Sequence, residues 1–440
     1  MTAEGVLHMF YQISDKGKLF YSGQLFDFEQ LKVGDLLGLA EFEHIRSATN
    51  TISQFSPLEE QLPIGFTLSQ DESKVLLYYN QSRVGKNSET FFQYKVLDVN
   101  DRFVNIQQGE FYSYHDSKAF SFKDMIVGDN GNINYLLKAY KEKGKREFVN
   151  KKPNYTYEIH HITGDENTEY IYDVKPSKTF INDLKLACDK AGNVYAAGFE
   201  RDRPDGDVIA SFFLSLDEKG YAKARKTEFY NPRDTEIIDG KARDKIDEEF
   251  RVVDVKMNGD VVYVFKQWMY KRENLNNNIN PGVGRFNTFN PGGNLNVSWS
   301  LDDVLVEAYD GQTGERKWIV INPRNQIVDS EFINEFAISE PILFDGDVYF
   351  VYNERDVNHE RIKENEELKS TNITGDFTFP TIVKITKDGD VKYSVLGGQK
   401  RFYIPRNGVS ISENGLFLIN VRSNYKRYRL GYGNSDILAF

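Results

Sequence analysis

The chain has 440 residues and a net charge of −11 at pH 7, and 40% of its residues are hydrophobic. The acidic balance argues against a dedicated nucleic-acid-binding protein, whose affinity rests largely on neutralising phosphates. No apolar run approaches the roughly 20 residues of a membrane-spanning helix, so no transmembrane segment is predicted.

Two kinds of β-hairpin alternate along the chain. The first kind has two apolar runs around a polar turn, and its clearest copy carries the turn Asn258-Gly259. Asn-Gly between alternating apolar residues is a strong hairpin signal, because both residues tolerate the positive φ of a tight turn. The six copies lie at residues 66–79, 125–137, 184–199, 252–265, 341–352 and 409–421. From Asp71 to Glu413 their mean spacing is roughly 68 residues, which indicates a repeat architecture.

The second kind of hairpin also occurs six times, at residues 6–26, 91–106, 155–174, 209–229, 304–321 and 381–396. One hairpin of each kind makes a four-stranded antiparallel unit, which is the blade of a β-propeller. We therefore predict an all-β fold with residues 1–440 in a single β-propeller domain. Six blades are preferred, and seven are the alternative if residues 435–440 form another strand.

The ends of the chain are expected to share a blade. The N-terminus supplies a second-kind hairpin without a partner before it, and the C-terminus supplies a first-kind hairpin with little after it. Joining them would close the ring and remove exposed sheet edges. Between the opening hairpin and the first full blade, residues 34–42 are predicted to form an edge strand or a short helix, and residues 47–57 a loop.

Long links occur at one point of the repeat, between the second and third strands. They cover residues 141–154, 271–299 and 356–379. In a propeller these links emerge on the face that also carries the connections between blades, where ligand sites usually collect on loops held by a rigid frame. The alternative interpretation is that they are tolerated surface insertions.

Two segments resemble known propeller repeats. Residues 308–318 (AYDGQTGERKW) resemble the repeat of pyrroloquinoline-quinone-type propellers, in which an Asp, a Thr-Gly turn and a Trp fix the outer hairpin and pack adjacent blades. Residues 189–198 (DKAGNVYAAG) are similar to a blade motif of several bacterial propeller families. Each resemblance covers one blade and implies the fold. Neither implies a quinone site, and no cofactor is predicted.

The abundance of Asn, Lys, Tyr and Phe resembles extracytoplasmic proteins of Bacteroidetes-type bacteria. This resemblance implies a location in the periplasm or at the cell surface, with the signal absent from the chain given. Cytoplasmic location is the alternative, because a chain with one cysteine fits either compartment.

A cation follows each first-kind hairpin, and the six cations are the candidate ligand-binding residues. They are Arg83, Lys141, Arg201, Arg272, Arg355 and Arg422. Repeat symmetry would bring them to one face, where they could hold carboxylate, phosphate or acidic-sugar groups. The alternative is that each cation is solvated or paired with an acid of a neighbouring blade.

Other reactive side chains are assigned structural roles. Cys188 lies in an apolar strand without a partner motif, so a buried structural thiol is expected. The carboxylates of residues 202–207 could supply oxygen ligands to calcium, but their spacing favours a polar turn. His160 and His161 point to opposite faces of a strand and cannot chelate one ion together. We predict no metal site.

The sequence predicts a non-catalytic binding or scaffold protein of the cell envelope that recognises a protein, peptide or glycan through one propeller face. The alternative is an enzyme, a glycoside hydrolase or lyase with its site at the central channel. No nucleophile elbow, metalloprotease helix or phosphate-binding glycine loop was found. Propeller glycosidases draw their carboxylates from different blades, so spacing in the sequence cannot identify a catalytic pair.

Overall fold

The structure, a computed structural model, describes most of the chain. The described residues are 6–13, 18–27, 32–42, 64–82, 90–112, 115, 119–141, 146–164, 169–176, 179–231, 234, 250–275, 295–329, 341–364, 366–372, 378–395, 402–403, 409–412, 415–424 and 427–435. Within them the chain forms thirty strands and one helix, α3 (Asp356–Lys363). No helix in this part of the chain is long and apolar enough to cross a membrane.

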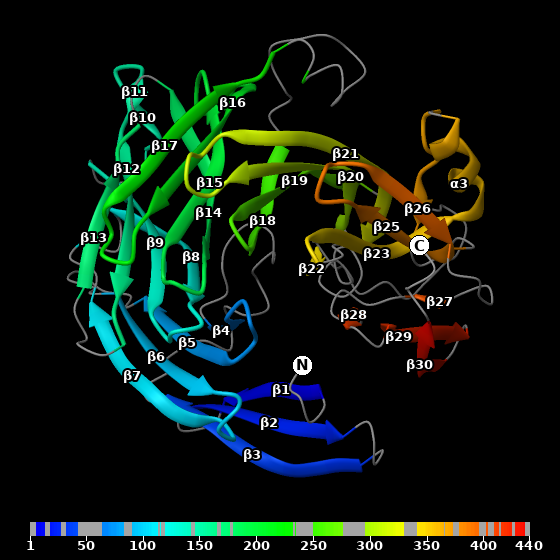
Figure 1. Ribbon diagram of the computed structural model, residues 1–440, viewed down its shortest axis with the longest axis horizontal. Helices are drawn as coiled ribbons and strands as arrows, with labels where there is room; N and C mark the ends of the chain where they lie inside the picture. Colours follow the sequence, from blue (N-terminus) through cyan, green and yellow to red (C-terminus); the bar gives the residue numbers. More distant parts are fainter. Residues whose placement is uncertain are drawn as a thin grey trace, which may run out of the picture. The chain divides into compact units, whose positions relative to one another are not determined.

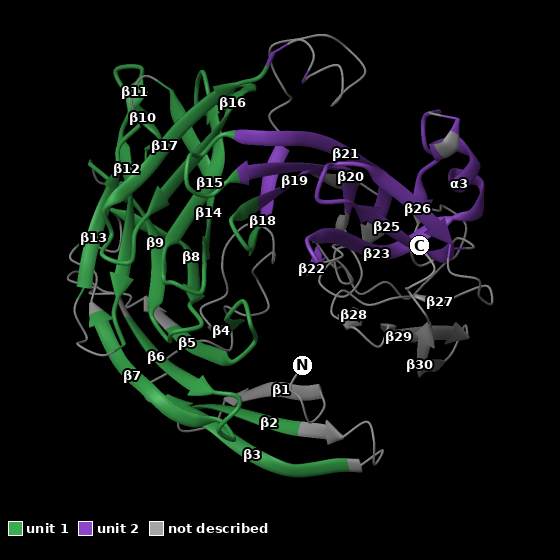
Figure 2. Ribbon diagram, in the orientation of Figure 1, with its two compact units in different colours: residues 1–230, 255–262, 310–315 green, residues 231–254, 263–309, 316–440 purple. Residues whose placement is uncertain are grey.

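Two compact units divide the chain (Figure 2). Unit 1 comprises residues 1–230, 255–262 and 310–315, and unit 2 comprises residues 231–254, 263–309 and 316–440. We number the sheets of three or more described strands from 1 to 7 in chain order. Sheets 1 to 4 belong to unit 1 and sheets 6 and 7 to unit 2. Sheet 5 belongs to unit 2 except for residues 255–262 and 310–315, which include the turns of its two hairpins and the strand residues next to them.

The sheets of unit 1 appear in Figure 1 from blue to green. Sheet 1 consists of β1 (Val6–Ile13), β2 (Leu19–Asp27) and β3 (Lys32–Phe42); sheet 2 of β4 (Ile64–Leu68), β5 (Lys74–Ser82), β6 (Thr90–Asp98) and β7 (Val104–Tyr112). Sheet 3 consists of β8 (Phe120–Val127), β9 (Ile133–Tyr140), β12 (Tyr155–Ile162) and β13 (Glu169–Val174); sheet 4 of β14 (Phe180–Cys188), β15 (Val194–Arg201), β16 (Val208–Leu216) and β17 (Ala222–Phe229). A separate ribbon pairs β10 (Phe148–Val149) with β11 (Lys152–Pro153).

The later sheets follow the same plan. Sheet 5 consists of β18 (Phe250–Asn258), β19 (Val261–Leu275), β20 (Leu295–Asp310), β21 (Arg316–Asp329) and β24 (Thr371–Asn372). Sheet 6 consists of β22 (Ile342–Phe344), β23 (Asp347–Arg355), β25 (Thr378–Ile385) and β26 (Val391–Val395); sheet 7 of β27 (Phe402–Tyr403), β28 (Val409–Ser412), β29 (Gly415–Asn424) and β30 (Arg427–Ser435). Only β24 pairs in parallel, with β21, among the pairings described.

All twelve predicted hairpins form. The first kind gives β4–β5, β8–β9, β14–β15, β18–β19, β22–β23 and β28–β29; the second gives β1–β2, β6–β7, β12–β13, β16–β17, β20–β21 and β25–β26. The chain is therefore all-β and built from the four-stranded antiparallel units of a β-propeller, as predicted. The number of blades and the single domain over residues 1–440 stay predictions.

In the described residues, β1 pairs with β2 near the N-terminus and β30 pairs with β29 near the C-terminus. The blade that the two chain ends are expected to share stays a prediction. β3 pairs with β2 and forms an edge of sheet 1. Of the two structures expected for residues 34–42, the edge strand is therefore the one that forms, and the short helix is not. Residues 47–57 and 436–440 lie outside the described residues.

Apolar residues pack between consecutive sheets of unit 1. One core cluster joins sheets 1 and 2, another joins sheets 2 and 3, and a third joins sheets 3 and 4. Strand β5 shows how the sequence does this: Val75 and Leu77 face the first cluster, and Leu76 faces the second. Because successive side chains point to opposite faces, a strand buried on both faces needs a continuous apolar run.

The two segments that resemble propeller repeats, residues 189–198 and 308–318, form hydrogen bonds that fix a turn and join two sheets. Asp189 accepts hydrogen bonds from the backbone N–H groups of Ala191 and Asn193 and from the hydroxyl of Tyr195. The indole of Trp318 on β21 donates a 2.9 Å hydrogen bond to the carbonyl of Lys387 in the β25–β26 turn. This Trp therefore links sheet 5 to sheet 6, which is the packing role that the resemblance implied.

Gly198 on β15 lies against a bulge in β14. A Cβ at this position would lie 2.8 Å from the carbonyl oxygen of Asn182, where Asp183 has a φ of 49°. We expect Gly198→Ala to lower the free energy of unfolding by about 1–3 kcal/mol, because the backbone must shift to admit the methyl group. Chemical denaturation measures the loss, and Gly38→Ala, whose Cβ would meet nothing within 4 Å, is the matched control. A loss no larger than that of the control would contradict the clash.

Candidate binding face at the ends of the second strands

Three predicted cations with described side chains occupy equivalent positions. Lys141 directly follows β9, whereas Arg201 and Arg355 are the last residues of β15 and β23. In each sheet this is the end of the second strand. The side chains of Arg272 in β19 and Arg422 in β29 are not described, and Arg83 lies outside the described residues.

Arg201 is 7% exposed and has structural contacts. Its Nη1 donates a 2.9 Å hydrogen bond to the carbonyl of Gly206, and its guanidinium carbon lies 5.4 Å from the ring centroid of Phe199. The guanidinium thus closes the turn at residues 202–207, the segment considered for calcium. These contacts favour the structural interpretation of Arg201, and a ligand role stays a prediction.

Arg355 lies where a long insertion leaves sheet 6. The insertion is folded: it forms α3 and then β24, which pairs with β21. Asn358 in α3 donates to Glu354 Oε1 at 2.7 Å and to the carbonyl of Lys369 at 2.7 Å. Arg355 Nη1 donates to the carbonyl of Ser370 at 3.1 Å. The insertion is therefore fixed to the end of β23 by buried polar contacts.

Glu354 is the centre of this anchor. Its side chain is fully buried, and burial raises the pKa of its carboxyl above the usual value. Thr371 Oγ1 and the backbone N–H of Arg355 also donate to Oε1. Donors that converge on one oxygen compensate part of the cost of burying a carboxyl group.

The insertion beside Lys141 is anchored in a different way. Lys138, which is buried, forms an ion pair with Glu147, and the Tyr140 hydroxyl donates a 2.9 Å hydrogen bond to the same carboxylate. Lys138 Nζ also lies 3.9 Å from the ring centroid of Tyr155, and burial lowers the pKa of the ammonium group. Lys141 itself is exposed, and its backbone N–H donates to the carbonyl of Asn154 at 2.9 Å. The cation is thus free to face solvent on a fixed backbone.

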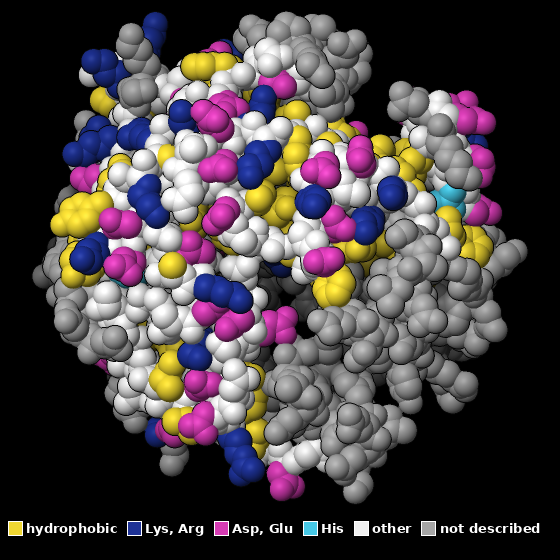
Figure 3. Space-filling model, in the orientation of Figure 1, with side chains coloured by type: hydrophobic (Ala, Val, Ile, Leu, Met, Phe, Trp, Pro, Cys, Tyr) yellow, Lys and Arg dark blue, Asp and Glu magenta, His cyan; other side chains and the backbone are white. Residues whose placement is uncertain are grey.

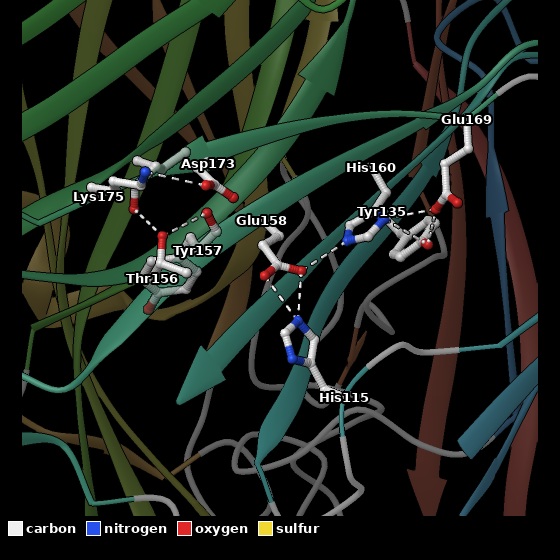
Figure 4. A network of polar contacts seen from close by, with 10 residues as sticks. His115, Tyr135, Thr156, Tyr157, Glu158, His160, Glu169, Asp173 and Lys175 are labelled. Atoms are coloured by element: carbon white, nitrogen blue, oxygen red, sulfur yellow. Dashed lines mark hydrogen bonds and ion pairs between the residues drawn. The ribbon is translucent and has the colours of Figure 1, made fainter. Parts of the chain in front are cut away.

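The two adjacent histidines have separate partners. His161 Nδ1 lies 2.6 Å from Asn134 Oδ1, and burial lowers its pKa. In Figure 4, His160 lies between two carboxylates, with Nδ1 2.7 Å from Glu169 Oε1 and Nε2 3.2 Å from Glu158 Oε2. The opposite orientations predicted for His160 and His161 are confirmed.

The carboxylate of Glu158 extends this network to a connection between sheets. His115, between β7 and β8, lies 2.9 Å from Glu158 Oε1. On the other side of His160, the Tyr135 hydroxyl lies 2.8 Å from Nδ1 and donates to Glu169 at 2.6 Å. Despite its buried position, hydrogen bonding to Glu158 and Glu169 raises the pKa of His160. The network ties the connection at residue 115 to strands β12 and β13.

Cys188 is buried, as predicted for a structural thiol. Burial raises the pKa of the thiol to about 12, and its Sγ lies 3.6 Å from the carbonyl oxygen of Val127.

Acidic and basic side chains are interspersed over the described part of the face seen in Figure 3. The anchors Glu147 and Asn358 were not predicted from the sequence, although both lie in the long insertions that were expected on the ligand-binding face.

No protein-family model and no curated protein matches this chain. Three solved structures resemble it in part: the polysaccharide lyase Uly1 (TM-score 0.46, 10% identity, 98% of this chain and 88% of that chain), the β-propeller domain of the Trilobed protease from Pyrococcus furiosus (0.40, 10%, 99% and 92%) and a protein of unknown function from Dyadobacter fermentans (0.32, 10%, 84% and 93%). At these scores and identities none of them assigns an activity to this chain.

Proposed function

We propose that this protein is a non-catalytic binding protein that recognises an acidic group of a protein, peptide or glycan partner through the ends of the second strands. The observation that carries the proposal is that exposed Lys141 stands beside an insertion fixed by the Lys138–Glu147 ion pair. A binding site needs side chains held on a rigid frame, because ordering a loose loop on binding costs affinity. Arg355 occupies the equivalent position in sheet 6, at the end of β23. The folded insertion beside it supports a binding role for Arg355 as well.

The remaining predicted cations belong to this proposal. Arg83, Arg272 and Arg422 would contribute charge at the equivalent strand ends, whereas Arg201 would hold its turn and contribute less. The composition bias of the sequence supports a location in the cell envelope. Fractionation of the native cells with an antibody against the protein tests that location, and a purely cytosolic protein would contradict it.

Binding to peptide and glycan arrays tests the binding function. We expect acidic ligands to be bound and Lys141→Ala to weaken that binding about three- to tenfold, with the difference shrinking at high salt. Lys219→Ala is the control, because Lys219 is also an exposed lysine and lies in the β16–β17 turn, at the other end of its sheet. Equal binding by wild type and Lys141→Ala would contradict the proposed face.

The alternative function, a glycoside hydrolase or lyase, is supported by one described carboxyl group. Asp303 is the bulged residue of β20 and accepts a 2.6 Å hydrogen bond from the backbone N–H of Arg324. Burial raises the pKa of Asp303 to about 7, a value suited to a general acid near neutral pH. Release of reducing ends or unsaturated products from polysaccharides, abolished in Asp303→Asn, would favour this function over simple binding.

A further inference from the structure

The insertion beside Lys141 contains a short β-hairpin that has no part in the binding function proposed above. In this hairpin β10 pairs with β11, and both strands are labelled in Figure 1 next to β12. Asn150 and Lys151 form the two-residue turn between them, with φ of 51° and 61°. Two successive positive φ values define a type I′ turn, whose twist matches that of the paired strands.

Hydrogen bonds hold the base of this hairpin in place. The carboxylate of Glu147 is engaged by buried Lys138, and the backbone N–H of Asn154 donates to the carbonyl of Glu147 at 3.0 Å. Asn154 Nδ2 also donates to the carbonyl of Arg146 at 3.1 Å. From this base to the turn the strands rise about 3.4 Å per residue, so the tip projects about 10 Å. The tip is thus a fixed protrusion, and little order has to be gained when it binds.

The hairpin exposes an aromatic ring among cations. Phe148 is 52% exposed, and the side chains of Arg146, Lys151 and Lys152 are exposed as well. None of these three cations forms an ion pair in the described part of the chain, because the nearby carboxylate of Glu147 already has its buried partner. In Figure 3, Lys and Arg side chains surround the corner of the view where β10 and β11 lie in Figure 1. The tip therefore carries uncompensated positive charge in a protein of net charge −11.

Lys151 stands where glycine would be less strained. A residue with a Cβ is unfavourable in the left-handed region, which is why glycine usually follows asparagine in turns of this type. Strained residues of this kind persist where the side chain has a function. The strain thus favours a function for the charge of Lys151, which lies in the turn that ends the hairpin.

Apolar and cationic side chains lie on both faces of this two-stranded ribbon. Phe148 is paired with Pro153, and Val149 is paired with Lys152. Directly opposite residues share a face, so Phe148 and Lys152 point to opposite faces. A groove on a protein would contact one face more than the other, and a convex tip cannot enclose a small ligand, whose sites are concave. A layer of lipid headgroups, by contrast, surrounds a protruding tip on every side.

We propose that this hairpin tip docks on an anionic lipid surface. Phe148 enters the boundary between headgroups and acyl chains, while Lys151 and Lys152 lie among the phosphates. The acidic body of the protein does not prevent this, because charges beyond about 8 Å are largely screened at physiological salt and the tip projects farther than that. The docking is weak and reversible, since each cation strengthens it only about fivefold. It does not depend on the recognition of acidic groups proposed for Lys141.

Co-sedimentation with lipid vesicles tests the proposal. Vesicles of phosphatidylcholine alone should bind the protein at least about tenfold more weakly than vesicles with equal parts of phosphatidylglycerol and phosphatidylcholine. Phe148→Ala and Lys151→Gly should each weaken binding to the anionic vesicles about three- to fivefold. Lys151→Gly should do so without loss of stability, because glycine relieves the strain of the turn. Phe229→Ala, which removes a 62% exposed ring on β17, and Lys219→Ala are the matched controls and should change binding less than about twofold.

Fluorescence shows whether the tip enters the lipid. Phe148→Trp should give a larger blue shift with anionic vesicles than wild type, which has 3 Trp. Lys141→Ala, at the base of the hairpin, should change vesicle binding less than about twofold, so the array result for Lys141 and the vesicle result are independent outcomes.

Five results would each overturn the proposal. They are no binding to anionic vesicles, equal binding to both kinds of vesicle, unchanged binding by Phe148→Ala or Lys151→Gly, an unshifted Phe148→Trp, and equal dependence on Phe148 in binding to soluble polyglutamate or heparin. The last result would assign the tip to an acidic macromolecule in place of a lipid surface.

Discussion

Replacing Glu307 by alanine should lower the free energy of unfolding by about 3–5 kcal/mol, because it leaves a charge buried without its partner. Glu307 and Lys266 are both fully buried and form an ion pair between the adjacent strands β19 and β20. Arg316 Nη1 also lies 3.2 Å from Glu307 Oε1, and the Tyr309 hydroxyl donates to Oε2 at 3.1 Å. Urea denaturation followed by circular dichroism measures the change.

Two further variants distinguish the buried charge from simple loss of side-chain volume. Glu315→Ala, on the exposed turn of the same hairpin, should change the free energy of unfolding by less than about 0.5 kcal/mol. Lys266→Met combined with Glu307→Leu should recover much of the loss, because an apolar pair of similar size needs no charge partner. Arg316 keeps its 2.7 Å ion pair with Asp234 in that double variant. A loss below about 1 kcal/mol in Glu307→Ala would contradict the energetic importance of this pair.

The second large effect is a pH dependence of stability that depends on His160. Although burial opposes the shift, hydrogen bonds to Glu158 and Glu169 raise the pKa of His160 above its ordinary value of 6.5. The folded protein therefore binds this proton more tightly than the unfolded chain. This contribution to stability is complete below pH 6.5 and is lost as the pH rises through the raised folded pKa.

The two carboxylates define the acid limit of the same network. The His160 hydrogen bond lowers the pKa of Glu169, and hydrogen bonds from His160 and His115 lower that of Glu158 even though burial opposes this. Their contribution to stability is present above the ordinary glutamate pKa of 4.5 and is lost as the pH falls through the lowered folded pKa values. The network should therefore stabilise the protein most between these limits.

His160→Gln isolates this effect from other titrations. His161 has a lowered pKa and changes stability in the opposite direction, so the measured quantity is the difference between wild type and variant. We expect the variant to lose about 1–3 kcal/mol near pH 5.5 and less near pH 8, because neutral His160 gives up its charged hydrogen bonds. Urea midpoints across this range measure the difference. A constant difference would contradict the role of the proton.

The parts of the fold that were predicted correctly depend on local chemistry. Gly259 has positive φ in the Asn-Gly turn that the sequence predicted, Gly220 and Gly389 have positive φ in the turns of two other predicted hairpins, and Asp217 accepts a hydrogen bond from the backbone of its own turn. A turn of this kind is specified by residues next to one another in sequence. The alternating kinds of hairpin were predictable for the same reason.

The additional strands near the two chain ends could not be deduced from the hairpin pattern. Residues 32–42 and 427–435 belong to none of the predicted hairpins. Each nevertheless adds one strand to the neighbouring sheet, β3 to β2 and β30 to β29. The hydrogen-bond partners of polar side chains could not be deduced from the sequence either. Glu158 and His115 are 43 residues apart, and Asn358 donates to the carbonyl of Lys369 only because an insertion folds back onto β23. Nothing in the spacing of these residues marks them as neighbours.

The sequence by itself determined the class of the fold, the twelve hairpins and the position of Lys141, Arg201 and Arg355 at the ends of the second strands, since strand alternation and turn chemistry act over a few residues. The tertiary structure decided which of these cations are exposed and which carboxylates are buried with a partner. Those properties depend on desolvation and on side chains from separate strands, and both are set only when the sheets pack.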